Sequence, residues 1–186
     1  MACNFHAAMN QATIHSLTLS LALLVGGVHA QTTASDNDQP TQVEADALRY
    51  DENKRLSVFT GNVKLTRGSL VIRGERLELQ EDEQGEQQGV ATGAPARFER
   101  DRPGTNERIQ GTAQRITYNS RSAVLVLDGD AVLRRLRDGK LADETRGARI
   151  DYTDSTGIFN VRGNPATGGS GRVTAVIGPK PASSGP

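Results

Sequence analysis

Histidine and cysteine most often supply the base, the nucleophile or the zinc ligands of a catalytic site. In this chain the one cysteine is Cys3, and the three histidines are His6, His15 and His29. If the first 30 residues are removed on export, as argued below, none of them is left. We therefore expect neither a histidine-based triad nor a zinc site, and no disulfide.

Carboxylates are the next candidates for acid–base or metal chemistry, and they occur as neighbours in the sequence. The groups are Asp51-Glu52, Glu81-Asp82-Glu83 and Asp143-Glu144. Neighbours on a strand point to opposite faces, so these carboxylates do not converge on one site. They lie in or near predicted turns, where we interpret them as solvated acids. Asp36-Asn37-Asp38 offers calcium ligands, but no glycine-centred loop accompanies it.

Two further motifs resemble functional signatures only superficially. Asp154-Ser155-Thr156-Gly157 is similar to an aspartic-protease motif, but the repeat described below explains it as a turn. The glycines between 168 and 171 are followed by neither Lys-Ser/Thr nor a helix, which a phosphate loop requires. We predict no enzyme activity, no cofactor and no metal. A lysine- or tyrosine-based site stays open, although no pattern marks one.

The N-terminus is uncharged and apolar. Residues 1–30 contain no Lys, Arg, Asp or Glu, and Leu17 to Val28 is mostly apolar. That run is shorter than the roughly 20 residues that span a bilayer. Val28-His29-Ala30 is a small-x-small pattern typical of a cleavage site. We predict a cleaved signal peptide over 1–30; the alternative is an apolar N-terminal anchor.

Charge elsewhere is balanced, with 22 basic and 22 acidic residues. This balance provides no excess of basic residues of the kind that indicates nucleic-acid binding. We interpret the cluster Arg134-Arg135-Arg137 as a solvated strand face or as charge that blocks edge pairing. Contact with an anionic head group is the alternative.

Most of the chain after the N-terminus is an internal repeat of short apolar-x-apolar pairs, each followed by a glycine. The pairs end at Tyr50, Leu79, Tyr118 and Tyr152, and the glycines are Gly61, Gly93, Gly129 and Gly163. Three of the four spacings are 11 residues, and the fourth is 14. Apolar and polar residues alternate within each unit, which is the pattern of a strand. We predict an all-β fold of about fifteen to sixteen short antiparallel strands separated by Gly, Asp-Gly and Asn-Pro turns. Asp138-Gly139 is one predicted hairpin turn.

The repeat also predicts which face is buried. The residues two before each glycine are Phe59, Ala91, Leu127 and Val161, all of them apolar. The residues next to them are Thr60, Thr92, Asp128 and Arg162, all of them polar. One apolar face per strand predicts a shared apolar interior. We predict strands at both ends of the domain, neither of them covered by a polar capping segment. Such strands could pair head to tail with another copy.

The ordered set of motifs resembles the LptA (OstA-like) family of periplasmic lipopolysaccharide export proteins. The set is Asp38-Gln39-Pro40, Phe59-Thr60-Gly61-Asn62-Val63, Pro95-Ala96-Arg97-Phe98, the Tyr118 strand and Arg172-Val173-Thr174-Ala175-Val176. The resemblance covers roughly residues 39–178. It implies an open, V-shaped β-jelly roll over 41–178, after a flexible segment at 31–40 and before a disordered tail at 179–186.

The resemblance further implies a groove for the acyl chains of lipid A. By position, Thr41, Val43, Phe98 and Tyr118 would line it. The apolar alternation adds Tyr50, Phe59, Val63, Leu79, Ile116, Leu125, Leu127, Tyr152, Phe159 and Val161.

The partners that the resemblance implies lie at the two edges of the sheet. An LptC-like inner-membrane protein would meet the first strands, at Thr41, Val43 and Leu48. An LptD-like outer-membrane protein, or another copy, would meet the last strand, at Arg172, Val173, Thr174 and Val176. Two alternatives stay open: a β scaffold with a filled core and no lipid site, and another OstA-like component such as LptC.

Overall fold

The computed structural model describes Asp36, residues 39–164 and residues 171–179. The predicted signal peptide, most of the predicted N-terminal segment and the tail from residue 180 lie outside the described residues. Everything described belongs to one compact unit, Thr33–Pro186. No helix within the described part is long and apolar enough to cross a membrane.

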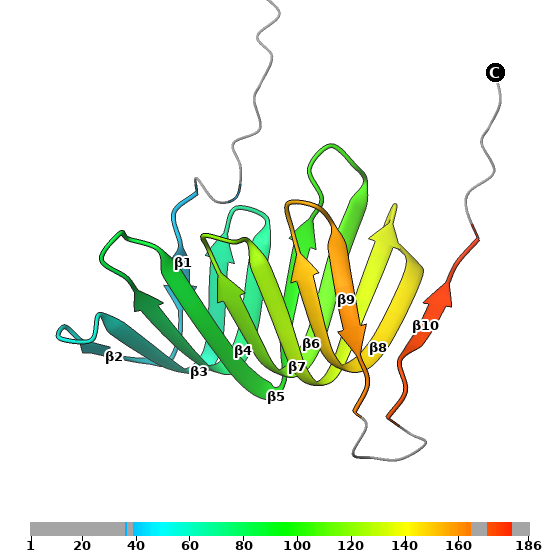
Figure 1. Cartoon of the computed structure of the whole chain (residues 1–186). Coiled ribbons are helices and arrows are strands. Elements are labelled where there is room, and N and C mark those ends of the chain that lie inside the picture. Colours follow the sequence, from blue (N-terminus) through cyan, green and yellow to red (C-terminus); the bar gives the residue numbers. More distant parts are fainter. Residues whose placement is uncertain (1–35, 37–38, 165–170, 180–186) are drawn as a thin grey trace, which may run out of the picture. The chain divides into compact units, whose positions relative to one another are not determined.

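The described residues form one antiparallel sheet of ten strands (Figure 1). The strands are β1 (Gln42–Glu44), β2 (Ala47–Asp51), β3 (Leu56–Arg67), β4 (Leu70–Glu81), β5 (Gln87–Asp101), β6 (Glu107–Asn119), β7 (Val124–Arg137), β8 (Lys140–Thr153), β9 (Ile158–Arg162) and β10 (Thr174–Ile177). Tight turns join them in sequence. Asp138 and Gly139, with φ of 51° and 73°, make the β7–β8 hairpin as predicted.

The six long strands, β3 to β8, each bend near the middle. The pairing register shifts between Thr60 and Val63 in β3, and between Asp128 and Ala131 in β7. Gly61 and Gly129 occupy these bulges with φ of 78° and 81°. The repeat glycines in β3, β5 and β7 therefore mark bends inside strands rather than the strand ends that we predicted. Counting each half of a bent strand separately gives the sixteen predicted segments.

The bends divide the sheet into two halves. The β2–β9 half contains Ala47–Asp51, 56–60, 76–81, 87–92, 115–119, 124–128, 149–153 and Ile158–Arg162. The β1–β10 half contains Gln42–Glu44, 63–67, 70–74, 96–101, 107–113, 131–137, 140–147 and Thr174–Ile177.

The two halves face each other across one apolar core. Phe98 of the β1–β10 half stacks on Tyr152 of the β2–β9 half, with ring centroids 6.4 Å apart. A Cβ atom at Gly111 would lie 2.7 Å from Leu127 Cδ2 in the opposite half. The pairing order runs from β1 to β10 without closing into a barrel. The predicted all-β, open architecture is therefore confirmed.

Candidate functional site

Two rows of inward-facing residues cross the β2–β9 half. Cross-strand pairing aligns the first row as Tyr50, Ser57, Leu79, Gly89, Tyr118, Leu125, Tyr152 and Phe159. The second row is Leu48, Phe59, Leu77, Ala91, Ile116, Leu127, Ile150 and Val161. The second row contains the residues two before the repeat glycines, so the repeat predicted the inner face correctly.

A third row lies opposite, on the β1–β10 half. Its members are Val43, Leu65, Ile72, Phe98, Gly111, Leu133, Thr145 and Ala175. Only Thr145 among them has a polar side chain, and it is 7% exposed. The three rows together give an almost uninterrupted apolar interior from β1 and β2 to β9 and β10.

The structure brings most of the predicted groove residues into this interior, and the middle of it is filled by their own side chains. Seven of them are at most 4% exposed: Val63, Phe98, Ile116, Tyr118, Leu125, Leu127 and Tyr152. Val43, Phe59 and Val161 are partly buried against this cluster. Burial raises the pKa of the Tyr118 and Tyr152 hydroxyls, to about 12 for Tyr152.

The N-terminal end of the interior is open and polar. Tyr50 is 60% exposed there, and it shares a cavity of about 370 Å³ with Leu79 and several charged residues. Thr41 donates a hydrogen bond of 2.9 Å to Gln87 Oε1 across this end. Thr41, Tyr50 and Leu79, all predicted groove residues, therefore lie at the polar N-terminal end of the interior.

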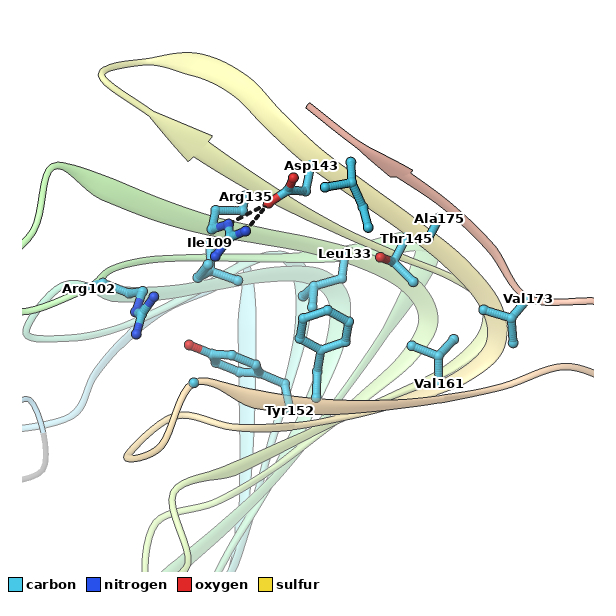
Figure 2. Close-up of a pocket in the computed structure, with 13 residues that line it drawn as sticks. Arg102, Ile109, Leu133, Arg135, Asp143, Thr145, Tyr152, Val161, Val173 and Ala175 are labelled. Atoms are coloured by element: carbon cyan, nitrogen blue, oxygen red, sulfur yellow. Dashed lines mark hydrogen bonds and ion pairs between the residues drawn. The ribbon is translucent and has the colours of Figure 1, made fainter. Parts of the chain in front are cut away.

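The C-terminal end opens into an apolar pocket of about 390 Å³, which we call the C-terminal pocket (Figure 2). Its lining comes from both halves of the sheet: Arg102, Ile109, Leu133, Arg135, Asp143, Thr145, Tyr152, Gly157, Phe159, Val161, Val173, Ala175 and Ile177. Phe159 is 44% exposed at the mouth. Thus the predicted groove residues Tyr152, Phe159 and Val161 line this pocket, together with Val173 of the predicted partner edge.

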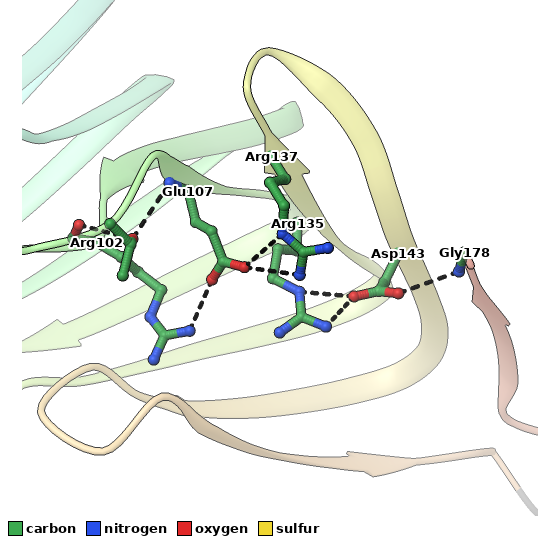
Figure 3. A network of polar contacts seen from close by, with 7 residues as sticks. Arg102, Glu107, Arg135, Arg137, Asp143 and Gly178 are labelled. Carbon is green, nitrogen blue, oxygen red and sulfur yellow. Dashed lines mark hydrogen bonds and ion pairs between the residues drawn. The ribbon is translucent and has the colours of Figure 1, made fainter. Parts of the chain in front are cut away.

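One edge of the C-terminal pocket carries a network of charges (Figure 3). Arg135 Nε donates to Asp143 Oδ2 at 2.6 Å, and Asp143 Oδ1 also accepts from the Gly178 N–H at 3.2 Å. Asp143 and Glu144 lie inside β8, whereas we expected them in or near a turn as solvated acids. They do point apart, since Glu144 pairs with Arg134 and Arg146 instead.

A separate set of ion pairs, centred on Arg100, joins the two halves of the sheet directly. Arg100, whose side chain is 4% exposed, pairs with Asp154 Oδ2 at 2.6 Å and with Asp36 Oδ2 at 3.1 Å. Burial raises the pKa of Asp154, although Arg100 acts against that shift. The Asp154 motif forms the predicted turn between β8 and β9, but its carboxylate is a structural partner that the sequence did not reveal.

The predicted partner residues lie at the sheet edges. Leu48 of β2 and Val176 of β10 are 58% and 63% exposed. Thr174 belongs to β10, which pairs only with β8 in the described sheet, and Arg172 and Val173 precede it. Among described residues, no group of three or more His, Cys, Asp or Glu could hold a metal ion.

Sequence reasoning did not predict Arg102, Ile109 or Leu133 as groove residues, although all three line the pocket. Ile109 and Leu133 alternate with polar neighbours, and that signal could have identified them. Arg102 carried no such signal, because its neighbours in the pocket come from distant strands.

The chain is similar to proteins of lipopolysaccharide export. The model of a family described as "LptA/(LptD N-terminal domain) LPS transport protein" matches residues 42–158. The lipopolysaccharide export system protein LptH of Pseudomonas aeruginosa is 26% identical over 169 residues, covering 88% of this chain and 93% of that protein. The lipopolysaccharide export system protein LptA of Escherichia coli K12 is 28% identical over 139 residues, covering 74% of this chain and 72% of that protein.

A solved structure shows the same similarity. The crystal structure of LptH from Pseudomonas aeruginosa, titled the LptA-homologous periplasmic component of a lipopolysaccharide transport device, superposes with a TM-score of 0.68. It is 28% identical, and the match covers 78% of this chain and all of that one.

Proposed function

Because the chain belongs to the family of LptA and LptD N-terminal-domain lipopolysaccharide transport proteins, we propose that it carries lipopolysaccharide across the periplasm. The interior shields the acyl chains of lipid A from water, while the sugars and phosphates stay solvated outside. The protein acts as a carrier and performs no catalytic step. Its family membership and its all-β fold support this role, and the relatives are named for the same export system.

The observation that carries the proposal is the apolar interior that opens at the C-terminal pocket. Phe159 and Val161 lie at its mouth, in line with the rows that cross the whole β2–β9 half. Each methylene moved from water into such a surface contributes about 0.8 kcal/mol. Transfer is passive in this scheme. An acyl chain enters where the two halves of the sheet are apart, and it passes along the predicted groove residues as the two halves separate.

The partners follow from the edges of the sheet. An LptC-like inner-membrane protein adds its strands at β1 and β2, at Thr41, Val43 and Leu48. An LptD-like outer-membrane protein, or a second copy, adds at β10 and the residues before it. The N-terminal residues 1–30 serve as the export signal, and residues 41–178 form the carrier domain.

The test is photo-crosslinking in cells. A photoreactive residue replaces Phe159 at the pocket mouth or Phe98 in the core, and adducts are probed for lipopolysaccharide. Asn160 and Asp128 are the matched controls, because both are exposed residues of the same sheet. We expect adducts at Phe159 and Phe98 and none at the controls.

A second candidate is a β scaffold that binds no lipid. The filled middle of the interior, with Leu125 and Leu127 fully buried, favours it. Absence of adducts at both inward positions, with the protein folded and exported, would establish the scaffold and reject the carrier.

A further inference from the structure

The two halves of the sheet are joined by continuous strands at the bends, and their free ends meet along a line that we call the seam. One rim of the seam belongs to the β1–β10 half, and the other belongs to the β2–β9 half and includes the β8–β9 turn. Leu70 and Ile109 on the first rim and Ala123 on the second are each at most 5% exposed. An acyl chain whose head group stays outside must therefore part the rims to reach the middle of the interior.

Arg100 joins the two rims through a buried ion pair. Its side chain is 4% exposed near the end of β5, and it pairs with Asp154 Oδ2 at 2.6 Å on the opposite rim. A hydrogen bond of 2.9 Å from Thr41 to Gln87 also crosses the seam, near its N-terminal end. Because hydrogen bonds between charged groups are about twice as strong as those between neutral groups, Arg100 makes the stronger of these two contacts.

Asp36 neutralises Arg100 on its own rim. Asp36 accepts from the Ser69 N–H at 2.9 Å and from the Ser69 hydroxyl at 2.6 Å, and its backbone carbonyl accepts from Arg67 at 3.2 Å. These contacts fix Asp36 to the β3–β4 turn, where its Oδ2 lies 3.1 Å from Arg100 Nε. If the rims part, Arg100 keeps this partner while Asp154 passes into water. The second carboxylate thus avoids the cost of a buried charge left alone.

Asp154 is held at the seam against an unfavourable environment. Burial raises the pKa of Asp154 more than Arg100 lowers it, and the nearby Asp36 raises it further. The charged form of Asp154 is therefore more stable in water than at the seam, so this ion pair holds the rims without locking them. Without Arg100, the carboxylates of Asp36 and Asp154 would face each other as like charges.

We propose that Arg100 is a clasp on the seam: its ion pair with Asp154 holds the rims together, and breaking that pair opens the interior sideways to an acyl chain. This inference rests on the proposed function, and it adds the route of entry and the residue that controls it. Arg100 and Asp36 stay together on the β1–β10 rim, so the clasp closes again on Asp154 after the chain has entered or left.

Spin labels on the two rims measure the seam without any lipid. Cys3 is the only cysteine, so the full chain with Cys3→Ser carries labels only at the introduced Asn106→Cys and Ser155→Cys. Both positions are exposed, in the β5–β6 and β8–β9 turns. These turns meet across the seam, since a Cβ atom at Gly157 would lie 2.9 Å from Arg102 Nη2. Electron paramagnetic resonance gives the label-to-label distances.

Three variants of the labelled protein assign the distance to the clasp. Arg100→Gln should raise the ratio of open to closed seam about tenfold, since a hydrogen bond to a charged group contributes on this scale. Adding Asp154→Asn to Arg100→Gln removes the repulsion between carboxylates and should return the distance toward that of the parent. Arg108→Gln is the matched control, because Arg108 pairs with Asp101 at 2.6 Å within one half. Unchanged distances in Arg100→Gln, or an equal change in Arg108→Gln, would overturn the clasp.

A chemical crosslink tests entry with the clasp residues intact, so it decides the question even if Arg100→Gln fails to fold. A short bismaleimide joins the cysteines at positions 106 and 155, and loading of fluorescent lipopolysaccharide is followed by stopped flow. Holding the rims together should abolish loading. The matched control joins cysteines from Asn106→Cys and Lys140→Cys, both in exposed turns of the β1–β10 half, and should load at the rate of the uncrosslinked protein.

Failure of the clasp is distinguishable from failure of the carrier. Equal loading rates in the two crosslinked proteins would reject sideways entry at the seam and leave lipopolysaccharide transport standing. A parent protein that binds no lipopolysaccharide would reject the proposed function and, with it, the role of Arg100 in entry.

Discussion

At the scale of single residues, Arg100 is a charged side chain that is almost fully buried in the described structure. It links β5 to Asp36 in the N-terminal segment and to Asp154 at the β8–β9 turn, so three distant segments meet at one guanidinium. Removing one partner of a buried ion pair leaves an uncompensated buried charge. Arg100 therefore fixes how the two halves of the sheet approach each other.

Replacing Arg100 by methionine should lower the free energy of unfolding at pH 7 by about 3–5 kcal/mol, because the partly buried carboxylates of Asp36 and Asp154 lose their cation. The folded-state pKa of Asp154 is raised above 3.8, so protonation of Asp154 stabilises the folded state as the pH falls through that raised value. The loss in Arg100→Met should therefore shrink on acidification. Urea denaturation at several pH values measures both effects.

The exposed pair Arg121–Asp82 gives the control Arg121→Met, which should lower the free energy of unfolding by under about 1 kcal/mol. An equal loss of stability in both variants would contradict this role of Arg100.

The apolar site residues were predictable from sequence, and the polar ones were not. The position of Phe59, Leu127 and Val161 two residues before a repeat glycine predicts that they face inward. In the structure they align in one row. Arg100 meets its partners only after the sheet has folded over, so no local pattern marks it. Whether an inward residue contacts lipid or packs as core also depends on the spacing of the two halves, which a strand pattern does not encode.

At the scale of elements, the bends are what turn one long strand into two short ones. Gly61-Asn62 and Gly129-Asp130 have the composition of turns, which is why the sequence predicted strand ends there. Both pairs do adopt positive φ, at 78° and 47° for the first and at 81° and 50° for the second. The chain nevertheless continues in the same direction along the sheet, because each pair makes a bulge instead of a reversal.

Gly129→Ala should destabilise the domain by about 1–2 kcal/mol, since an L-residue is forced into the left-handed region. The ideal Cβ would also lie 2.7 Å from Gln114 Oε1 and 3.0 Å from Gln114 Cβ, so the Gln114 side chain would have to shift as well. Gly89→Ala is the matched control: its Cβ would meet Leu79 Cδ1 at 3.6 Å, an ordinary contact, and its φ is not positive. Urea midpoints measured side by side should fall for Gly129→Ala and hold for Gly89→Ala. Equal midpoints in the two variants would mean that the bulge tolerates a side chain.

At the scale of the whole domain, the sheet formed by the described residues ends in an unpaired edge on each side. Gly178 N–H donates to Ala142 O at 2.8 Å, and the register pairs Val176 with Glu144. Alternation along an antiparallel strand then directs the N–H groups of Ala175 and Ile177 away from β8. A partner strand that extends the sheet here would pair with these two donors and contact the exposed side chains of Val176 and Ile177.

Ile177→Pro tests this edge without breaking the sheet, because the lost N–H is one that β8 does not use. If a second copy or a partner adds a strand here, the proline should abolish concentration-dependent association in analytical ultracentrifugation. Ile177→Ala is the matched control: it removes the same apolar side chain, which also lines the C-terminal pocket, but keeps the N–H. Association that survives in Ile177→Ala and disappears in Ile177→Pro would assign the contact to backbone strand addition at β10. Loss in both variants would assign it to the apolar side chain instead, and a parent protein that stays monomeric over a wide concentration range would reject assembly of copies at this edge.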